Sequence, residues 1–299
     1  MTETSAKAPG ADATTGLPEK EWRERAARHA ARVDVLTANH LRRRRAGEPH
    51  PIEDFLFTYY NLKPAQLRRW HPGVGTVLFG EGARERLGER FYTETDAGVG
   101  LDVPVFLAAR PVTGFVEHLL SAVTARPAHL GCFGLHEWAM VYRTDEVRHT
   151  QVPLRLGGEG TDRVVESHRI QCSHFDAFRF FTDAARPRNT LRPTRETQAA
   201  LDQPGCLHAT MDLYKWAYKL TPAVPSELVA DCFALAREVR ILDMRASPYD
   251  LRAWGYEPVR IETAEGKADY MEHQRDFATR GAVLRERLLA VCRTLRAHA

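Results

Sequence analysis

The sequence predicts a helix-rich α+β protein with a minority β-sheet, folded as a single large domain. The last third of the chain carries apolar residues at helical spacing, while the strand candidates are few and short. The chain has 299 residues, of which 43% are hydrophobic, enough to bury a sizeable core. Neither an internal repeat nor a coiled-coil heptad is present, so we expect an ordinary globular core.

A disordered N-terminal tail is predicted over residues 1–19, because these residues are rich in Ala, Thr, Gly and Glu and lack an apolar segment. Ordered structure is expected from residue 20 to residue 299 as one α-rich domain. Its first element is a charged helix over residues 19–45, in which Trp22, Ala26, Val33 and Leu36 share one stripe. Gly47 and Pro49 then end this helix.

The remaining elements follow from apolar periodicity and from the positions of Pro and Gly. Strands are predicted over residues 76–79, 103–107 and 166–176. Helices are predicted over residues 52–60, 64–70, 112–124, 135–142, 194–201, 206–219, 226–244 and 267–297. Two regions, residues 143–160 and the Pro-punctuated stretch around residues 187–193, have the composition of loops.

Charge and cysteine content narrow the class of protein. The net charge is only +3, but residues 20–80 hold twelve Lys or Arg against six Asp or Glu, so this basic segment has an excess of six positive charges. The cysteines are odd in number and scattered, which disfavours a disulfide framework. No apolar run reaches the roughly 18 residues of a membrane span. We therefore expect a cytoplasmic protein without a membrane partner.

Residues 166–176 carry the most distinctive pattern. On a strand, Glu166, His168, Cys172, His174 and Asp176 would share one face, because side chains alternate with period two. These groups bind metals or shuttle protons near neutral pH. The same face could instead be a hydrogen-bonded polar support under a helix.

A metal site on this face would use His168, His174 and Glu166, a ligand set that suits zinc or iron as a divalent cofactor. Two imidazoles six residues apart on a strand start about 20 Å apart at the backbone. The strand would therefore have to bend near Cys172 before both could bind one ion.

A second pattern lies in the helix predicted over residues 206–219. There His208, Asp212 and Lys215 fall on one face, so the carboxylate could orient the imidazole while the ammonium keeps it ionised. The flanking Tyr214 and Trp216 argue against full exposure. An ordinary surface row of ion pairs is the alternative.

Further candidates come from two other segments. Glu137 beside Trp138 would suit a pocket in which the acid transfers a proton and the indole stacks on a ring. The alternative is a core Trp with an exposed Glu. Contact with a polyanion is predicted for the run at the end of the first helix, which consists of Arg42, Arg43, Arg44 and Arg45.

Five segments of the sequence resemble actinobacterial proteins identified as 3-methyladenine DNA glycosylases, and the similarity extends over most of residues 20–298. These segments are residues 50–60, 69–73, 203–208, 211–215 and 242–250. The resemblance implies DNA repair by excision of alkylated purines from duplex DNA. A methylated adenine is cationic and leaves easily, so an aromatic cleft and one carboxylate could suffice.

Under this hypothesis the basic segment binds backbone phosphates, Trp138, Tyr214 or Trp216 stacks the base, and Glu137 or Asp212 acts on the sugar cation or on water. A second hypothesis is a metal-dependent oxygenase or hydrolase acting on a small molecule. It would use some of His136, Glu166, His168, His174, His208 and Asp212. The third is a non-catalytic binding protein, and no protein partner is predicted.

Overall fold

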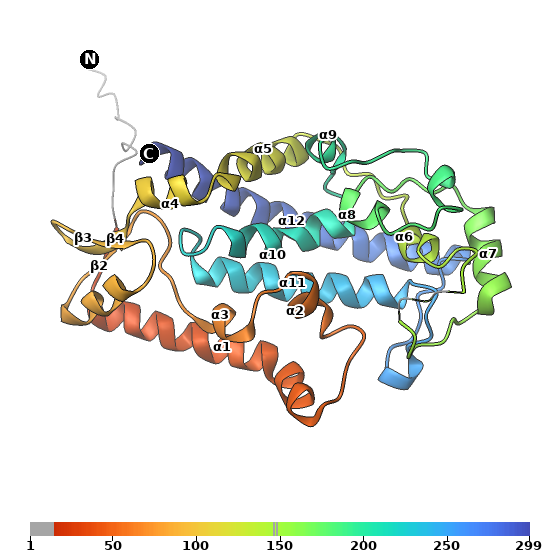
Figure 1. Cartoon of the computed structure of the whole chain (residues 1–299), viewed down its shortest axis with the longest axis horizontal. Coiled ribbons are helices and arrows are strands. Elements are labelled where there is room, and N and C mark those ends of the chain that lie inside the picture. Colours follow the sequence, from red (N-terminus) through yellow and green to blue (C-terminus); the bar gives the residue numbers. More distant parts are fainter. Residues whose placement is uncertain (1–14, 146, 148) are drawn as a thin grey trace, which may run out of the picture.

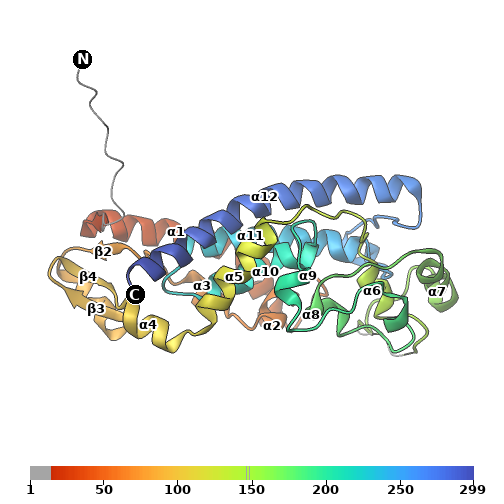
Figure 2. The ribbon, with the colours of Figure 1, turned by 90° about the horizontal axis from the view of Figure 1, so that it is seen from above.

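The computed structural model describes residues 15–145, 147 and 149–299. The chain is 58% helical with 6% strand in a single four-stranded sheet, which confirms the predicted helix-rich α+β class. Figures 1 and 2 show an elongated body of long helices with the small sheet at one end and short helices at the other.

The long helix α1 (Glu19–Ala46) forms one side of the body, close to its predicted bounds. It begins with Glu19 and Glu21 in its first turn and ends in a run of arginines, an arrangement that complements the helix dipole. Gly47 stops it in the left-handed conformation, with φ of 72°, and its N–H caps the last carbonyls.

The sheet has the order β1-β2-β4-β3, with β1 parallel to β2 and the other pairs antiparallel. Residues 1–14 of the predicted tail lie outside the described residues, but the tail prediction extends too far, because residues 15–17 form a strand. This strand is fixed by Leu17, which is buried against Trp22 and Leu78. The strands are β1 (Thr15–Leu17), β2 (Thr76–Leu78), β3 (Tyr92–Thr95) and β4 (Gly98–Leu101).

The strand predicted over residues 103–107 is wrong, because this stretch forms helix α4 (Val103–Ala109). The Asp102 carboxylate accepts a hydrogen bond from the Val105 N–H at 3.0 Å, and Pro104 sits in the first turn. These capping signals outweigh the β-propensity of two valines. The other elements of this half are α2 (Phe55–Tyr59), α3 (Pro64–Arg68) and the 3₁₀ helix η1 (Glu81–Gly88).

The core lies between α5 (Val112–Thr124), α10 (Leu207–Lys219), α11 (Ser226–Arg245) and α12 (Ala264–Ala297). All four helices were predicted within about three residues of their bounds. The longest is α12, about 50 Å at 1.5 Å per residue, and it lies along the length of the body in Figure 2. Its start is fixed by Thr263, whose hydroxyl accepts a hydrogen bond from the Gly266 N–H at 3.0 Å.

The strand predicted over residues 166–176 is also wrong. Residues up to 167 belong to α7 (Gly157–Ser167), where Val164 and Val165 are buried on one face, and the chain then runs irregularly to the short α8 (Phe175–Phe178). The alternation of polar residues spans a helix end and a loop. The other short helices of this end are α6 (Leu135–Ala139) and α9 (Gln198–Leu201), the latter shorter than the predicted 194–201.

Within the described residues, no single helix has the length and apolar character needed to cross a bilayer; α4 and α5 meet these criteria only together, and they are bent by 84°. The five cysteines are all free in the structure. They are Cys132, Cys172, Cys206, Cys232 and Cys292.

Candidate metal centre

Three buried histidines from separate segments meet in the half of the molecule that holds the short helices. His136 lies in α6, His174 directly precedes α8, and His208 is in the first turn of α10. The ring of His208 lies edge-on to that of His136, with centroids 4.4 Å apart, and stacks on that of His174 at 5.4 Å. The segments singled out by sequence therefore converge.

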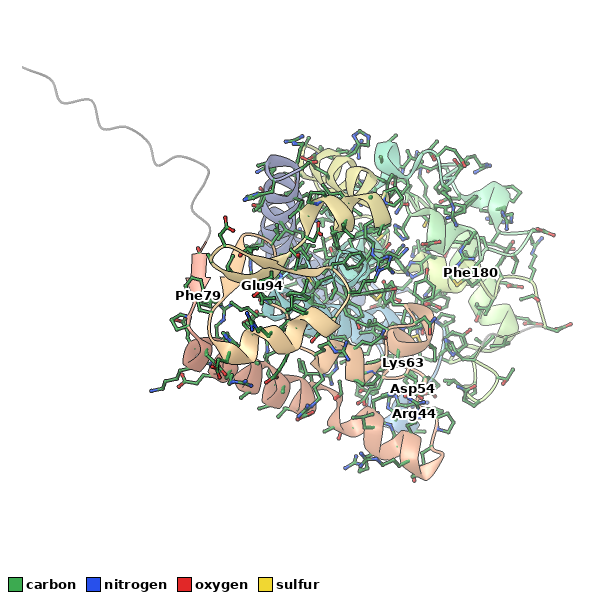
Figure 3. The ribbon with its side chains drawn as sticks, turned by 60° about the vertical axis from the view of Figure 1, so that its left-hand side comes forward. Arg44, Asp54, Lys63, Phe79, Glu94 and Phe180 are labelled. Carbon is green, nitrogen blue, oxygen red and sulfur yellow. The ribbon has the colours of Figure 1, made fainter. Side chains whose placement is uncertain are left out.

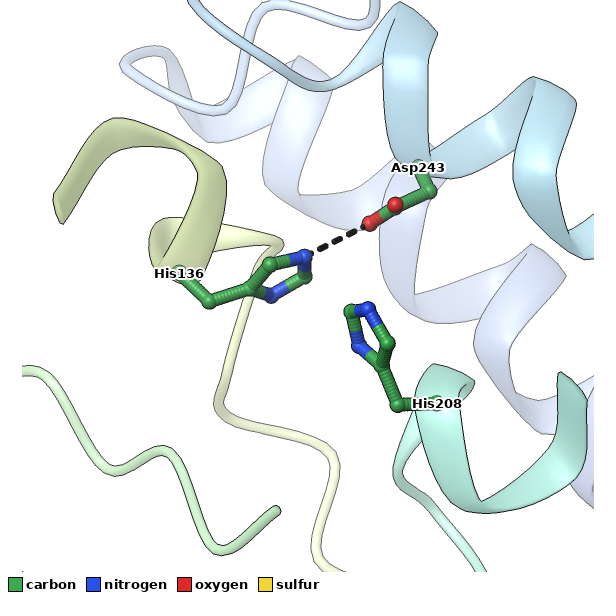
Figure 4. A group of neighbouring side chains, drawn as sticks. All are labelled: His136, His208 and Asp243. Carbon is green, nitrogen blue, oxygen red and sulfur yellow. Dashed lines mark ion pairs between the residues drawn. The ribbon is translucent and has the colours of Figure 1, made fainter. Parts of the chain in front are cut away.

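His136 and His208 form a compact group with Asp243, which comes from the last turn of α11 (Figure 4). One ligand atom from each of the three lies within 4.8 Å of the other two, and all three side chains are buried. His136 Nε2 is 2.9 Å from Asp243 Oδ1, yet neither atom has a hydrogen-bond partner of acceptable geometry in the described part of the chain. The two atoms thus form a buried ion pair that lacks the geometry of a hydrogen bond.

The protonation states of the group differ. Burial, together with the neighbouring His136, holds the pKa of His208 well below its usual value, so its imidazole is neutral and keeps a free lone pair. Burial alone would lower the pKa of His136, but the Asp243 carboxylate outweighs it and raises that pKa. Burial alone would raise the pKa of Asp243, but His136 lowers it more, so this carboxylate stays ionised.

Arg240 fixes the other oxygen of Asp243. Its NH1 donates to Asp243 Oδ2 at 2.7 Å and to Glu137 Oε1 at 2.8 Å, and its guanidinium lies 3.9 Å from the centroid of the Phe55 ring. All of Arg240, Glu137 and Asp243 are buried. A charge-assisted hydrogen bond therefore orients Oδ2 of Asp243, and Oδ1 of the same carboxylate is left to face the histidines.

A second group, formed by His174, Asp176 and Asp212, already contains a cation. Lys215 Nζ lies 2.7 Å from Asp212 Oδ2 and 3.0 Å from Asp176 Oδ2. Burial lowers the pKa of Lys215, but the two carboxylates raise it more, so the ammonium stays charged. A side chain of the protein itself thus supplies a cation to the second group.

His174 is held between two carboxylates. Its Nδ1 lies 3.0 Å from Asp202 Oδ1, and its Nε2 lies 3.7 Å from Asp212 Oδ2. Tyr60 completes the surroundings of Asp212 by donating to Oδ1 at 2.8 Å. Asp202 therefore orients the imidazole of His174 and faces its ring toward Asp212.

The two groups together carry an excess of negative charge. Five carboxylates stand against three cations, which leaves two negative charges in a mostly buried region. Two protonated imidazoles or one divalent cation would neutralise them. The carboxylates belong to Glu137, Asp176, Asp202, Asp212 and Asp243, and the cations belong to Arg179, Lys215 and Arg240.

A cavity of about 310 Å³ adjoins the centre. Its aromatic walls come from Phe55, Tyr59 and Phe180, and its polar wall comes from Glu137, Asp176, His208 and Arg240. Burial raises the pKa of Tyr59 to about 12, so its hydroxyl stays protonated. A much smaller cavity, of about 20 Å³, lies against His136 and His208, and Cys132, Cys172 and Cys206 are among the residues that line it.

Asp212 contacts Tyr60, His174 and Lys215, but its imidazole partner differs from the predicted one. The helix spacing predicted that it orients His208, whereas the imidazole beside it belongs to His174. The predicted pair of Asp212 with Lys215 is present at 2.7 Å. Residues four apart on a helix need not touch when each is drawn toward a neighbour from another segment.

The aromatic residues predicted to stack a substrate lie in the core. Trp138 is fully buried and its indole N–H donates to the Ala246 carbonyl at 2.8 Å. Tyr214 is fully buried as well, and Trp216 is 5% exposed. The structure therefore does not bring these three rings to the 310 Å³ cavity.

The metal ligand set of Glu166, His168 and His174 is not brought together. Glu166 is exposed and accepts hydrogen bonds from Tyr142 and Arg143, while His168 Nδ1 lies 2.7 Å from the Val164 carbonyl. Only His174 belongs to a group of convergent ligand atoms among the residues described here. Helix α7 ends at Ser167, so Glu166 lies within the helix whereas His168 and His174 lie beyond its end.

The basic run at the end of α1 remains largely on the surface. Arg42, Arg44 and Arg45 are exposed, whereas Arg43 pairs with Glu53 and is half-buried. Arg44 borders a surface cavity of about 700 Å³, and Figure 3 shows it close to Asp54 and Lys63, away from Phe180 of the 310 Å³ cavity.

Sequence reasoning missed Asp243, Arg240, Asp202 and Tyr60 as members of the site. A signal existed for two of them, since Arg240 and Asp243 are oppositely charged residues three apart on a helix. Their immediate neighbours in the sequence, Val239, Ile241, Leu242 and Met244, are apolar. Asp202 and Tyr60 lie in a loop and just beyond a short helix, where no periodic pattern marks them.

Comparison of the chain with protein-family models, with curated proteins and with solved structures finds no match.

Proposed function

We propose that the protein is a metal-dependent enzyme acting on a small molecule, with one divalent ion held by His136, His208 and Asp243. The observation that carries this proposal is the convergence of three buried ligand atoms. Two of them, His136 Nε2 and Asp243 Oδ1, lie 2.9 Å apart as an ion pair without hydrogen-bond geometry. Two imidazoles and one carboxylate suit zinc in a hydrolase or non-haem iron in an oxygenase.

The surroundings favour a reactive ion over a purely structural one. Three protein ligands leave coordination positions free, and His208 also lines the 310 Å³ cavity, which is large enough for a small substrate. Bound there, the ion would polarise a substrate or a water molecule. Glu137 and Asp176 line the same cavity and would accept or return a proton, while Phe55, Tyr59 and Phe180 give the cavity an apolar wall.

Metal content tests this proposal directly. We expect protein purified without chelator to carry about one equivalent of zinc or iron per chain, measured by elemental analysis. His208→Ala should reduce bound metal by at least about tenfold, because it removes one of three protein ligands.

The matched control is His168→Ala, which removes a histidine from the same half of the molecule that is not a member of the group. Its metal content should equal that of the wild type. A wild-type protein that takes up no divalent metal even after incubation with zinc or ferrous ions would refute the proposed centre.

A second candidate function is excision of an alkylated purine, as the sequence resemblance implies. One observation favours it: the 310 Å³ cavity combines three aromatic side chains with the carboxylates of Glu137 and Asp176, which suits a flat cationic base. In this proposal Phe55, Tyr59 and Phe180 replace the predicted stacking residues.

The basic run provides the test of this second candidate. Replacing Arg42, Arg44 and Arg45 by Gln should weaken binding of duplex DNA of any sequence and flatten its salt dependence by about 0.9 for each phosphate that the variant no longer neutralises. Fluorescence anisotropy over a salt series measures both. Unchanged affinity and slope, with no release of methylated base from alkylated duplex, would exclude the glycosylase.

A further inference from the structure

Another cavity lies at the other end of α10, remote from the candidate metal centre. It has a volume of about 720 Å³, within the range of small-molecule sites. Lys219, at the end of α10, lines it and follows His208 by eleven residues, which places the two about 16 Å apart along the helix. The cavity is therefore separate from the candidate metal centre.

Its walls carry one sign of charge. Arg69, Arg110 and Lys219 come from three separate segments, and no Asp or Glu is among the described residues that line the cavity. Arg69 has a distant partner in Glu89, with NH1 4.0 Å from Oε2, whereas Arg110 and Lys219 form no ion pair with any described residue. Two cations therefore face the cavity without a counter-charge from the protein.

The neighbouring groups do not supply that counter-charge. Arg110 lies over the Phe91 ring at 5.3 Å and Lys219 over the Trp216 ring at 5.5 Å, which orients both side chains without neutralising them. Burial, together with the charge of Lys215, lowers the pKa of Lys219. Neutral side chains of Asn61 and Thr221 also line the cavity and can donate hydrogen bonds.

We propose that this cavity binds a small molecule bearing a phosphate or diphosphate group. Three cations converging on one concave surface match the several oxygens of such an anion, and Arg110 and Arg69 can each donate two parallel hydrogen bonds to it. The proposal does not depend on the metal centre.

Isothermal titration of the full-length protein with inorganic pyrophosphate tests it. We expect saturable binding with one site per chain. In the double variant Arg110→Gln/Lys219→Gln, the dissociation constant should rise at least about tenfold for each cation removed. The control is Lys20→Gln/Arg293→Gln, which removes two exposed cations that lie outside the cavity. Its affinity should equal that of the wild type.

Pyrophosphate can also bind a metal ion, so His208→Ala is titrated in parallel. Unchanged affinity in that variant places the anion outside the metal centre, whereas loss of binding there would overturn the proposal. An absence of binding to the wild type, or equal weakening in the control, would overturn it as well. Lys219 is exposed, so Lys219→Gln alone carries the test if the double variant does not fold.

Discussion

Asp243→Asn should lower the free energy of unfolding by about 3–5 kcal/mol. The carboxylate is fully buried and lies between His136 Nε2 at 2.9 Å and Arg240 NH1 at 2.7 Å. The amide keeps the shape but removes the charge, so the guanidinium of Arg240 stays buried with Glu137 as its remaining anionic partner. Urea unfolding followed by circular dichroism measures the loss.

Asp34→Asn is the matched control, because Asp34 also pairs with an arginine, Arg68 at 2.8 Å, but both side chains are about half exposed. This variant should lose no more than about 1 kcal/mol, since water solvates whichever partner remains. Equal losses in the two variants would contradict the role of burial. The Asp243 variant should also lose its bound metal, which the control should keep.

Lys215→Met should produce a loss of similar size, about 3–5 kcal/mol. The ammonium is the cation shared by Asp212 and Asp176, and its side chain is 13% exposed. Without it, the carboxylate of Asp212 remains buried beside Tyr60 and His174 with no fixed positive charge against it. Thermal and urea unfolding at neutral pH measure the effect.

Arg280→Met is the control, because Arg280 likewise pairs with two carboxylates, those of Glu238 and Asp276, but at the surface. We expect a loss below about 1 kcal/mol there. The double variant Asp212→Asn/Lys215→Met should recover part of the free energy of unfolding that Lys215→Met removes. Removing both buried charges destabilises the protein less than removing one of them. A double variant less stable than the sum of its single variants would disprove this coupling.

The parts of the fold that sequence predicted are those with a strong periodic signal. The residues of α10, α11 and α12 repeat at helical spacing over three turns or more, so their bounds were found within three residues. The strands predicted over residues 103–107 and 166–176 failed for a common reason. Each stretch is short, and local capping or a helix end decided its conformation where side-chain alternation suggested a strand.

The sequence singled out His174, His208 and Glu137 in three separate segments, because imidazoles and carboxylates can bind metals or transfer protons. In the structure the rings of His174 and His208 stack, and His208 and Glu137 line one cavity. Their partners could not be paired from sequence, since contacts such as Asp202 with His174 depend on how loops cross in space. Asp243 is the clearest case: its neighbours are 35 and 107 positions away along the chain.

This separation along the chain has a thermodynamic consequence. His136, His208 and Asp243 approach one another only when α6, α10 and α11 have all docked. An ion bound by the three, as proposed, would therefore select the complete fold by mass action. It would add about 2.7 kcal/mol to the stability of the fold at a free concentration of 100 times its dissociation constant. Because α10 and α11 belong to the central core, that gain is shared by the whole helical body, and no excised peptide that lacks one of these helices could retain the site.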